Sequence, residues 1–429
     1  MRPNVPLTSW RRAYVCPDVN STRRTHGQKM APKLERFVSP WKGNGLRATV
    51  RIEEGELVYV TEPLAYCVCF HLFSRHETLL RCSQCKMARY CSATCQRRAW
   101  SDHKRECKCL QSLLPRIPTD SVRLAARLIF AMQRKQGLSQ LATMLKLYLH
   151  KEVPDLPQDT PSLSSCRDAL SLIAKVTCNC FTISDGELQE IGVGLYPSLS
   201  LLNHDCRPNC VMVFEGTKLL LRAVRGLSPG EELTISYIET LSLNEDRQQR
   251  LEDQYCFTCH CQRCNSPDND KLMLSGEESS WRVLKEALPT LEELKAKSNW
   301  QTLVESCHRL LSTEGKRVPE ENLYKLRVTD MALDASIQLG LWTEAVEYGQ
   351  KTLPVYHLYY PDPHPVHGVQ LVRVGKLQHY LAHIEEALDT FKQAYRILKV
   401  THGNDHSITT DLLMKMEECR AEMVQQSSR

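Results

Sequence analysis

The order of hydrophobic and polar positions divides the chain into a strand-rich part and a helical part. In residues 35–68 and 195–237, short apolar runs are separated by glycine turn signals, which is typical of β-strands. Residues 111–150 carry apolar side chains at mixed spacings of three and four, and residues 167–183 read as a second helix passing into a buried segment. After about residue 275, long helical patterns take over. The pattern therefore predicts an α+β body followed by an all-helical tail.

The helical tail contains an internal repeat. Similar segments begin at Trp300, Trp342 and Ile384, which are steps of 42 residues, and the pairs His364-Pro365 and His406-Ser407 recur at the same step. A large apolar residue followed three positions later by a smaller one is what stacked helical hairpins require. The repeat resembles a tetratricopeptide array, whose usual step is about 34 residues. A plain helical bundle is the alternative.

Length and composition limit the class of protein. A chain of 429 residues is too long for one hydrophobic core, so we expect two or three domains. The hydrophobic fraction of 42% and the charged fraction of 24% are those of a soluble globular protein. No apolar run is long enough to cross a bilayer, so no membrane partner is expected. The net charge of +5 does not indicate a nucleic-acid binder, and the basic residues of the first cysteine cluster read as a solvated face, so we do not expect sequence-specific DNA binding.

The first 32 residues differ from the rest. They are rich in arginine and almost free of acidic residues, which is the bias of a mitochondrial transit peptide. No amphipathic helix is sustained there, so we expect an unstructured extension, with the transit peptide as the alternative. These residues also lack the apolar stretch of a secretory signal. Because the 20 cysteines are clustered in a chain without that signal, they indicate zinc sites and not disulfides.

Three closely spaced pairs form the first cysteine cluster. Two ligands that are two or three residues apart can face one metal ion from a tight turn or from one face of a helix. Six ligands therefore predict one full tetrahedral zinc site and half of another. The pairs are Cys82-x2-Cys85, Cys91-x3-Cys95 and His103-x3-Cys107.

This cluster resembles a MYND zinc finger. The resemblance lies in Cys82-Ser-Gln-Cys, Arg89-Tyr-Cys-Ser-Ala-Thr-Cys-Gln and Trp100-Ser-Asp-His-Lys-Arg-Glu-Cys. It implies one site made by Cys82, Cys85, His103 and Cys107. Cys91 and Cys95 would join an earlier Cys-x-x-Cys pair that this sequence lacks, and Cys67, Cys69, His71 and His76 are the candidate replacements. The second site of the module therefore stays open.

Two further segments carry the candidate chemistry. They are Leu201-Leu-Asn-His-Asp-Cys-Arg-Pro-Asn-Cys and Gly230-Glu-Glu-Leu-Thr-Ile-Ser-Tyr, followed by Cys259-x-Cys261-x2-Cys264. Together with the earlier Gly43-Asn44-Gly45 they resemble the SET domain of protein-lysine methyltransferases and its post-SET zinc site. Glycines at 43 and 45 would let the backbone close on a ligand, because they carry no Cβ. Cys206 can complete a four-sulfur zinc site with the trio at 259–264.

The SET resemblance also implies roles for individual residues. Tyr237 would sit at the transferred methyl group, and Phe181 and Tyr255 would line the channel for the substrate lysine. The cofactor, S-adenosylmethionine, would contact residues from both segments and from the amino-proximal turn: Lys42, Gly43, Asn44, Asn179, Asn203, His204, Tyr237 and Phe257. Asn203 and His204 would offer backbone and side-chain hydrogen bonds, and Phe257 would lie against the adenine.

A free lysine has a pKa of about 10.4, so its ammonium must lose a proton before the nitrogen can accept a methyl group. A narrow aromatic channel disfavours the charged form by desolvation and also aligns the reacting atoms. The residue types expected at the site therefore suit methyl transfer to nitrogen.

A MYND module inside a SET domain with a helical-repeat tail is the arrangement of the SET-and-MYND-domain methyltransferases. The resemblance covers about residues 34–429 and looks closest to the third member of that family. It predicts a SET β-fold split by a zinc module, a post-SET zinc site and a tetratricopeptide-like tail. The expected units are an extension (1–32), the first SET part (33–70), a truncated MYND module (71–108), a helical insert (109–185), the core SET part (186–245), the post-SET segment (246–272) and the tail (273–429).

The family resemblance implies a protein-lysine N-methyltransferase that acts on histone or non-histone lysines in the nucleus and cytoplasm. It also implies that the MYND module binds proline-rich peptides and that the tail binds a heat-shock chaperone. Lys42 stands where the family has arginine, and an insert that would follow Gly137 is absent. A catalytically weak adaptor that binds peptides through the MYND module and the tail is therefore the alternative function.

Overall fold

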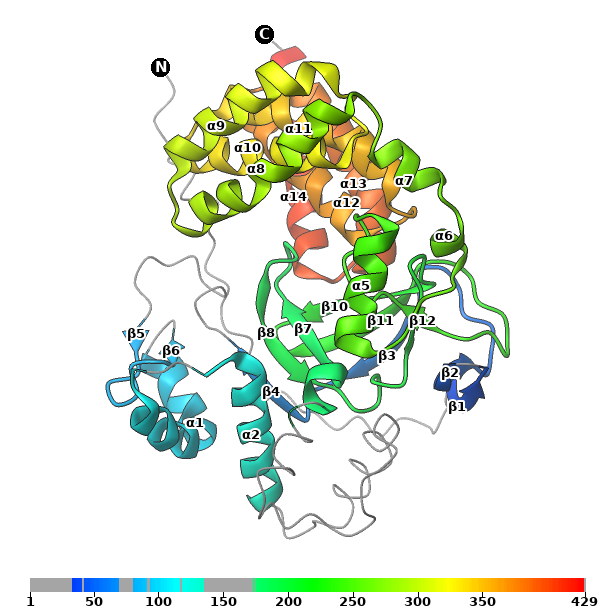
Figure 1. Cartoon of the computed structure of the whole chain (residues 1–429), viewed down its shortest axis with the longest axis vertical. Helices are drawn as coiled ribbons and strands as arrows, with labels where there is room; N and C mark the ends of the chain where they lie inside the picture. Colours follow the sequence, from blue (N-terminus) through cyan, green and yellow to red (C-terminus); the bar gives the residue numbers. More distant parts are fainter. Residues whose placement is uncertain are drawn as a thin grey trace.

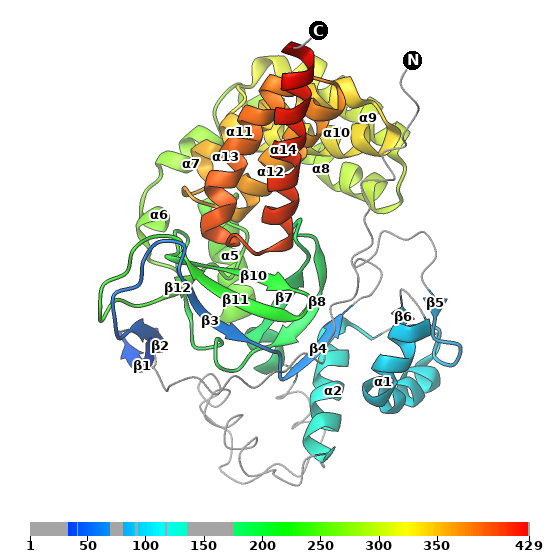
Figure 2. The same cartoon turned by 180° about the vertical axis from the view of Figure 1, so that it is seen from behind.

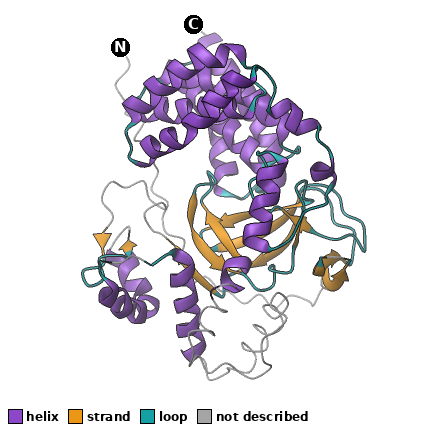
Figure 3. Ribbon diagram, viewed as in Figure 1, coloured by secondary structure: helices purple, strands orange, loops and turns teal. Residues whose placement is uncertain are grey.

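The computed structural model describes residues 33–40, 42–68, 80–90, 93–115, 118–134, 173 and 175–427 (Figure 1). The expectations for the extension 1–32, for the absent insert after Gly137 and for Cys91 concern residues outside this part of the chain. The α+β class is confirmed. Strands form the body, and helices form the tail above it (Figure 3).

Short antiparallel sheets build the body. One sheet has the strand order β10-β11-β3, a second has the order β4-β8-β7, and β1 pairs with β2 in a hairpin. Their apolar faces enclose one core that includes Ile52, Leu202 and Leu221. The strands are β1 (Leu34–Ser39), β2 (Gly43–Ala48), β3 (Leu57–Thr61), β4 (Ala65–Val68), β7 (Cys180–Ser184), β8 (Glu190–Leu195), β10 (Cys210–Glu215) and β11 (Lys218–Ala223).

Two very short strands bring the chemical segments together. Strand β9 (Asn203–His204) runs parallel to β12 (Thr234–Ile235), with Asn203 opposite Thr234 and His204 opposite Ile235. Parallel neighbours need a crossover connection, and the hairpin β10-β11 lies in that connection. The Asn203-His204 turn therefore lies beside the strand that leads into Tyr237.

The first zinc cluster occupies a separate small unit beside the body. It consists of β5 (Leu80–Arg81), β6 (Arg89–Tyr90) and helix α1 (Ala93–Leu113), and α2 (Asp120–Arg134) connects it to β4 and β8. The sequence pattern placed a helix from residue 111 onwards. That boundary is wrong, because α1 already begins at Ala93 and ends at Leu113, and a new helix begins at Asp120. Residues 93–107 were interpreted as zinc-ligand pairs and not as a helix, although His103 and Cys107 are separated by one helical turn.

Stacked antiparallel helices form the tail, and the repeat sets where they begin. Helices α9, α11 and α13 start at Trp300, Trp342 and Ile384, the three positions of the 42-residue step. The His-Pro and His-Ser pairs start α12 and α14, where the ring Nδ1 of each histidine accepts a hydrogen bond from the amide two residues later. The tetratricopeptide-like arrangement is therefore confirmed. Three short helices precede the tail: α5 (Asn244–Tyr255), α6 (Gln262–Asn265) and α7 (Asp268–Met273). The tail helices are α8 (Glu278–Ala296), α9 (Trp300–Thr313), the 3-10 helix η2 (Glu314–Arg317), α10 (Leu323–Leu339), α11 (Trp342–Tyr359), α12 (Pro365–Tyr380), α13 (Ile384–Thr401) and α14 (Ser407–Ser427).

The end of the tail returns to the body. Figure 2 shows the lower ends of α13 and α14 beside the sheet that contains β10 and β11. There the ring of His406 contacts the carbonyl of Phe214 through Nε2 at 3.1 Å, and Arg222 donates to the carbonyl of Gly55 at 2.9 Å. Among the described residues, no helix is long and apolar enough to span a membrane.

Candidate functional site

Tyr237 is held at the junction of the two chemical segments. Its hydroxyl donates to the carbonyl of Leu202, and its backbone N–H donates to Nδ1 of His204 at 3.0 Å. Both partners belong to the segment that the sequence analysis paired with Tyr237. The structure therefore brings Tyr237 and the Asn203-His204 turn together, as the resemblance implied.

Aromatic rings surround the Tyr237 side chain. The ring centroid of Tyr255 lies 4.8 Å from that of Tyr237, and that of Phe257 lies 6.2 Å away. Burial raises the pKa of Tyr255 to about 12, so this phenol is neutral near neutral pH, and its hydroxyl donates to the carbonyl of Tyr237 at 3.4 Å. Phe181 packs against the same core but makes its ring contact with Tyr196, at 5.7 Å. The rings that lie near Tyr237 thus belong to Tyr255, His204 and Phe257.

The amino-proximal turn lies against Asn203. The side-chain amide of Asn203 donates to the carbonyl of Asn44 at 3.3 Å and to Glu232 at 2.7 Å. A Cβ on Gly45 would lie 2.7 Å from Glu232 Oε1 and 2.9 Å from Asn203 Nδ2, so a larger residue would force these side-chain groups to move. Gly43 has a φ of +79°, a conformation that also favours glycine.

Two polar residues at this turn stand out. The ammonium of Lys42 lies 3.7 Å from Glu232, which places its charge at the Asn203 turn. Glu232 was missed as a site residue, although it is part of the Gly-Glu-Glu motif. A glutamate that accepts a hydrogen bond from Asn203 could have been inferred only from the strand pairing, which the sequence does not specify.

Among the described residues, no hydrogen bond of the Asn179 side chain connects it to this turn. Its amide donates back to the carbonyl of Lys175 at 2.9 Å, and its own carbonyl accepts a hydrogen bond from Ser200. Asn179 therefore lies at the start of β7, where it closes the preceding helical turn.

Both ring nitrogens of His204 are already engaged within the protein. Nδ1 accepts from Tyr237, and Nε2 lies 3.3 Å from the sulfur of Cys206. Burial lowers the pKa of His204 to about 4, so the ring is neutral near neutral pH. A cofactor contact from His204 would therefore come from its backbone, and the expectation of a side-chain hydrogen bond does not fit this geometry.

The second cysteine cluster has the geometry of a zinc site. The sulfurs of Cys206, Cys259, Cys261 and Cys264 all lie within 4.8 Å of one another, and those of Cys206 and Cys264 are 3.5 Å apart. Tetrahedral Zn²⁺ with Zn–S bonds of about 2.3 Å separates its sulfurs by about 3.8 Å. The four thiols therefore fit Zn²⁺, which would fasten the post-SET segment to the Asn203-His204 turn.

The first cluster also converges on one zinc site. The ligand atoms of Cys82, Cys85, His103 and Cys107 lie within 4.8 Å of one another. The structure thus brings together the four ligands that the MYND resemblance assigned. Cys91 and the side chain of Cys95 lie outside the described residues, and so do three of the candidate replacements, Cys69, His71 and His76. The fourth, Cys67, is buried and its thiol contacts Asp120.

Glu106 connects this zinc site to the body, a role that no motif of the sequence indicates. It contacts Nδ1 of His103 at 3.2 Å, which leaves Nε2 facing the ligand cluster. Its carboxylate also accepts hydrogen bonds from Arg123 and Arg127 of α2, and Arg127 donates to the carbonyl of Tyr66 on β4. Burial alone would raise the pKa of Glu106, but the hydrogen bond from His103 and the two guanidinium charges lower it to about 2.

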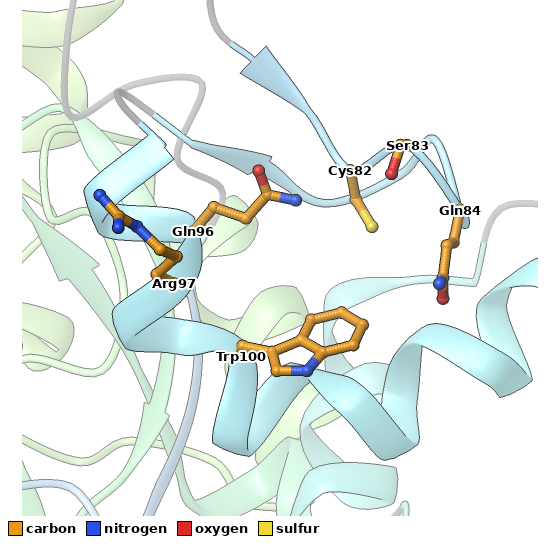
Figure 4. Close-up of a pocket in the computed structure, with 6 residues that line it drawn as sticks. All are labelled: Cys82, Ser83, Gln84, Gln96, Arg97 and Trp100. Atoms are coloured by element: carbon orange, nitrogen blue, oxygen red, sulfur yellow. The ribbon is translucent and has the colours of Figure 1, made fainter.

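A shallow pocket lies on the outer face of the zinc module (Figure 4). The indole of Trp100 and the side chain of Gln96 project from α1 toward the turn that carries Cys82 and Gln84. An aromatic ring beside amide groups offers both an apolar surface and hydrogen bonds to an extended peptide. The full lining is Cys82, Ser83, Gln84, Gln96, Arg97 and Trp100.

Known proteins resemble this chain over most of its length. A family model of the SET domain matches residues 43–238. The human histone-lysine N-methyltransferase SMYD3 is 44% identical over 423 residues, covering 91% of this chain and 98% of that protein. The mouse histone-lysine N-methyltransferase Smyd1 is 34% identical over 436 residues, covering 90% of this chain and 89% of that protein. A solved structure of the SET domain of LSMT, bound to lysine and AdoHcy, aligns at 12% identity over 93% of this chain and 89% of that one with a TM-score of 0.27, which is too low to bear on this fold.

Proposed function

This chain belongs to the SMYD family, and from that premise we propose that it is an S-adenosylmethionine-dependent N-methyltransferase acting on lysines of histones and other proteins. The observation that carries the proposal is the position of Tyr237. Its phenol is fixed to the carbonyl of Leu202 and faces the aromatic rings of Tyr255 and Phe257.

The residues around Tyr237 suit the neutral amine that methyl transfer requires. A lysine side chain among Tyr237, Tyr255 and Phe181 would lose part of its hydration, which favours loss of its proton. The Tyr237 hydroxyl and the carbonyl of Leu202 supply polar atoms that orient the nitrogen. Fixing nitrogen and methyl donor in line is the main requirement of such a transfer.

The turn residues fit the cofactor by the chemistry of their groups. Lys42 offers a cation to a carboxylate, the carbonyl of Asn44 and the side-chain oxygen of Asn203 can accept hydrogen bonds, and Phe257 offers a ring face to adenine. S-adenosylmethionine supplies the methyl group that the lysine nitrogen takes up. Lysine at position 42 keeps the charge of the family's arginine but lacks its bidentate grip, so we expect weaker cofactor binding than an arginine would give.

The test is a methylation assay of the full chain against histones and a peptide array, run beside Tyr237→Phe. Wild type should transfer labelled methyl groups to lysine, and Tyr237→Phe should lower kcat by about 100-fold, because the hydroxyl acts at the reacting atoms. His402→Leu, a buried change in the tail, should leave kcat close to wild type. Equal activity of wild type and Tyr237→Phe would contradict this role.

Calorimetric titration with S-adenosylmethionine separates the enzyme from the alternative, a catalytically weak adaptor. We expect heat of binding at micromolar cofactor for wild type. No heat at high micromolar cofactor, together with retained peptide binding, would overturn the enzyme and favour the adaptor.

The pocket on the zinc module supports a second binding function, for proline-rich peptides. The indole of Trp100 suits the preformed, apolar face of a polyproline helix, and Gln84 and Gln96 can bond its carbonyls. A fluorescently labelled proline-rich peptide should bind wild type, and Trp100→Ala should weaken binding about tenfold or more. Arg282→Ala, an exposed change far away on α8, is the control.

Two further expectations remain part of this proposal. The helical tail would bind a cytosolic heat-shock chaperone, and the protein would act in both cytoplasm and nucleus, as family membership suggests. A purified chaperone should bind the full chain in a sedimentation assay, and fractionation of cells should recover the protein from both compartments.

A further inference from the structure

We infer that His204 and Arg247 are positioning residues that couple the four-cysteine zinc site to Tyr237. Each side chain contacts a ligand sulfur with one nitrogen. With another nitrogen each holds the backbone of residues 237–242, the segment that begins at Tyr237. The importance of this coupling for catalysis rests on the proposed function of Tyr237, but the contacts themselves do not depend on that function.

The hydrogen bonds of His204 fix the position of its ring proton. Because the N–H of Tyr237 donates to Nδ1 at 3.0 Å, Nδ1 must carry a lone pair. The proton of the neutral ring is then on Nε2, which lies 3.3 Å from the sulfur of Cys206 and donates to it. A zinc-bound cysteine is a thiolate and accepts this bond more strongly than a neutral thiol would.

Arg247 makes the matching contact at the other end of the segment. Its guanidinium donates to the carbonyl of Ser242 at 2.5 Å and lies 3.7 Å from the sulfur of Cys264. The side chain is 1% exposed, so its charge needs a buried partner. Four thiolates around Zn²⁺ leave a net charge of about −2, which supplies that partner.

The two contacts hold the segment at both ends, and the zinc site lies between them. With zinc in place, charge on the sulfurs strengthens both hydrogen bonds. Without zinc the four cysteines are no longer held around one ion, so both contacts loosen, and the amide of Tyr237 and the carbonyl of Ser242 lose their fixed partners. The phenol of Tyr237, which also packs against the cluster that contains the zinc ligands, would then be less firmly placed on Leu202.

The experiment measures hydrogen exchange of the full chain by mass spectrometry, together with zinc release to a chromogenic chelator. The variants are His204→Leu, which removes both ring bonds, His204→Gln, which can keep a donor and an acceptor, and Arg247→Met. Cys206→Ser identifies the zinc released from this site. His402→Leu, another buried histidine, controls for the loss of a buried ring.

In His204→Leu and Arg247→Met we expect zinc affinity at this site to fall by about 10- to 100-fold, the usual effect of losing a ligand's hydrogen-bond partner. In His204→Leu the Tyr237 amide should exchange about tenfold faster. Zinc removal from wild type should have the same effect on that amide. His204→Gln should restore part of both properties, and His402→Leu should change neither.

Tyr237 exchange that is unchanged in His204→Leu, or unchanged when wild type loses zinc, would overturn the coupling. So would equal zinc affinity of wild type and both His204 variants. None of these measurements uses methyl transfer, so an inactive protein with the expected exchange pattern would contradict the proposed function and leave the coupling intact.

Discussion

Gly403 lies directly against the guanidinium of Arg222, where the helical tail meets the body. A Cβ on Gly403 would lie 2.5 Å from Cζ of Arg222, and the φ of Gly403 is +88°. Arg222 in turn donates to the carbonyl of Gly55. The positive φ of Gly403 favours glycine, and a larger residue there would also have to push the Arg222 guanidinium aside at the contact between α13 and β11.

Gly403→Ala should therefore loosen the tail from the body. The new methyl group would displace the Arg222 side chain and occupy a backbone conformation that alanine disfavours, at a cost of about 1–3 kcal/mol. Thermal unfolding should show a lower Tm, and limited proteolysis should cut the junction faster. Gly226→Ala is the matched control, because its Cβ would meet only one atom, at 3.9 Å. Equal losses in the two variants would contradict the argument.

Glu106 is not a zinc ligand, but its carboxylate should contribute strongly to the stability and the zinc affinity of the module. In Glu106→Gln, His103 and two partly buried guanidinium groups lose the charge of a buried partner, so we expect a loss of about 3–5 kcal/mol and weaker zinc binding by the module. Chemical denaturation and chelator competition measure the two effects. Glu293→Gln removes an exposed ion pair with Lys297 and should cost less than about 1 kcal/mol.

The contribution of Asp330 to the free energy of unfolding should fall as the pH rises. Burial raises its pKa from 3.8 to about 7, against the opposing hydrogen bond from Tyr356. A raised folded pKa means that the folded state holds the proton more tightly, so this contribution is complete below pH 3.8 and is lost as the pH rises through about 7. The Tm of wild type should therefore fall relative to the Tm of Asp330→Asn as the pH rises from about 5 to about 8. A difference that stays constant with pH would show that Asp330 does not titrate there.

The sequence specified the local features of this protein well. The repeat at Trp300, Trp342 and Ile384 marked the first residues of three helices, because each helix start repeats with the unit. The spacings marked candidate ligand pairs, and together with the MYND and SET resemblances they assigned eight ligands, seven cysteines and His103, that the structure gathers into two groups. Ligand spacing carries this information because neighbouring ligands share one turn or one helix face.

Long-range partners could not be predicted in the same way. Glu106 meets Arg127 only because α2 docks on the zinc module, and Glu232 meets Asn203 only because β12 pairs with β9. The two ring bonds of His204 depend on the same pairing. No residue type or spacing in the sequence encodes these contacts, so they follow from the fold alone.

Gly45→Ala gives a sharp test of the candidate cofactor turn. A methyl group there would overlap Glu232 and Asn203, so the amide of Asn203 would leave the carbonyl of Asn44. Misplacement of site groups by about 1 Å can lower activity by about 100-fold, so we expect a similar loss of kcat/KM and a clear rise in the Kd for S-adenosylmethionine. Because the side chains nearest that methyl group belong to Glu232, Asn203 and Phe37, none of which is a zinc ligand, zinc content should change much less than cofactor binding. Calorimetry on Gly45→Ala and on the Gly226→Ala control measures the Kd. If both variants bound the cofactor as wild type does, the turn formed by Asn44, Gly45 and Asn203 would not be the cofactor site.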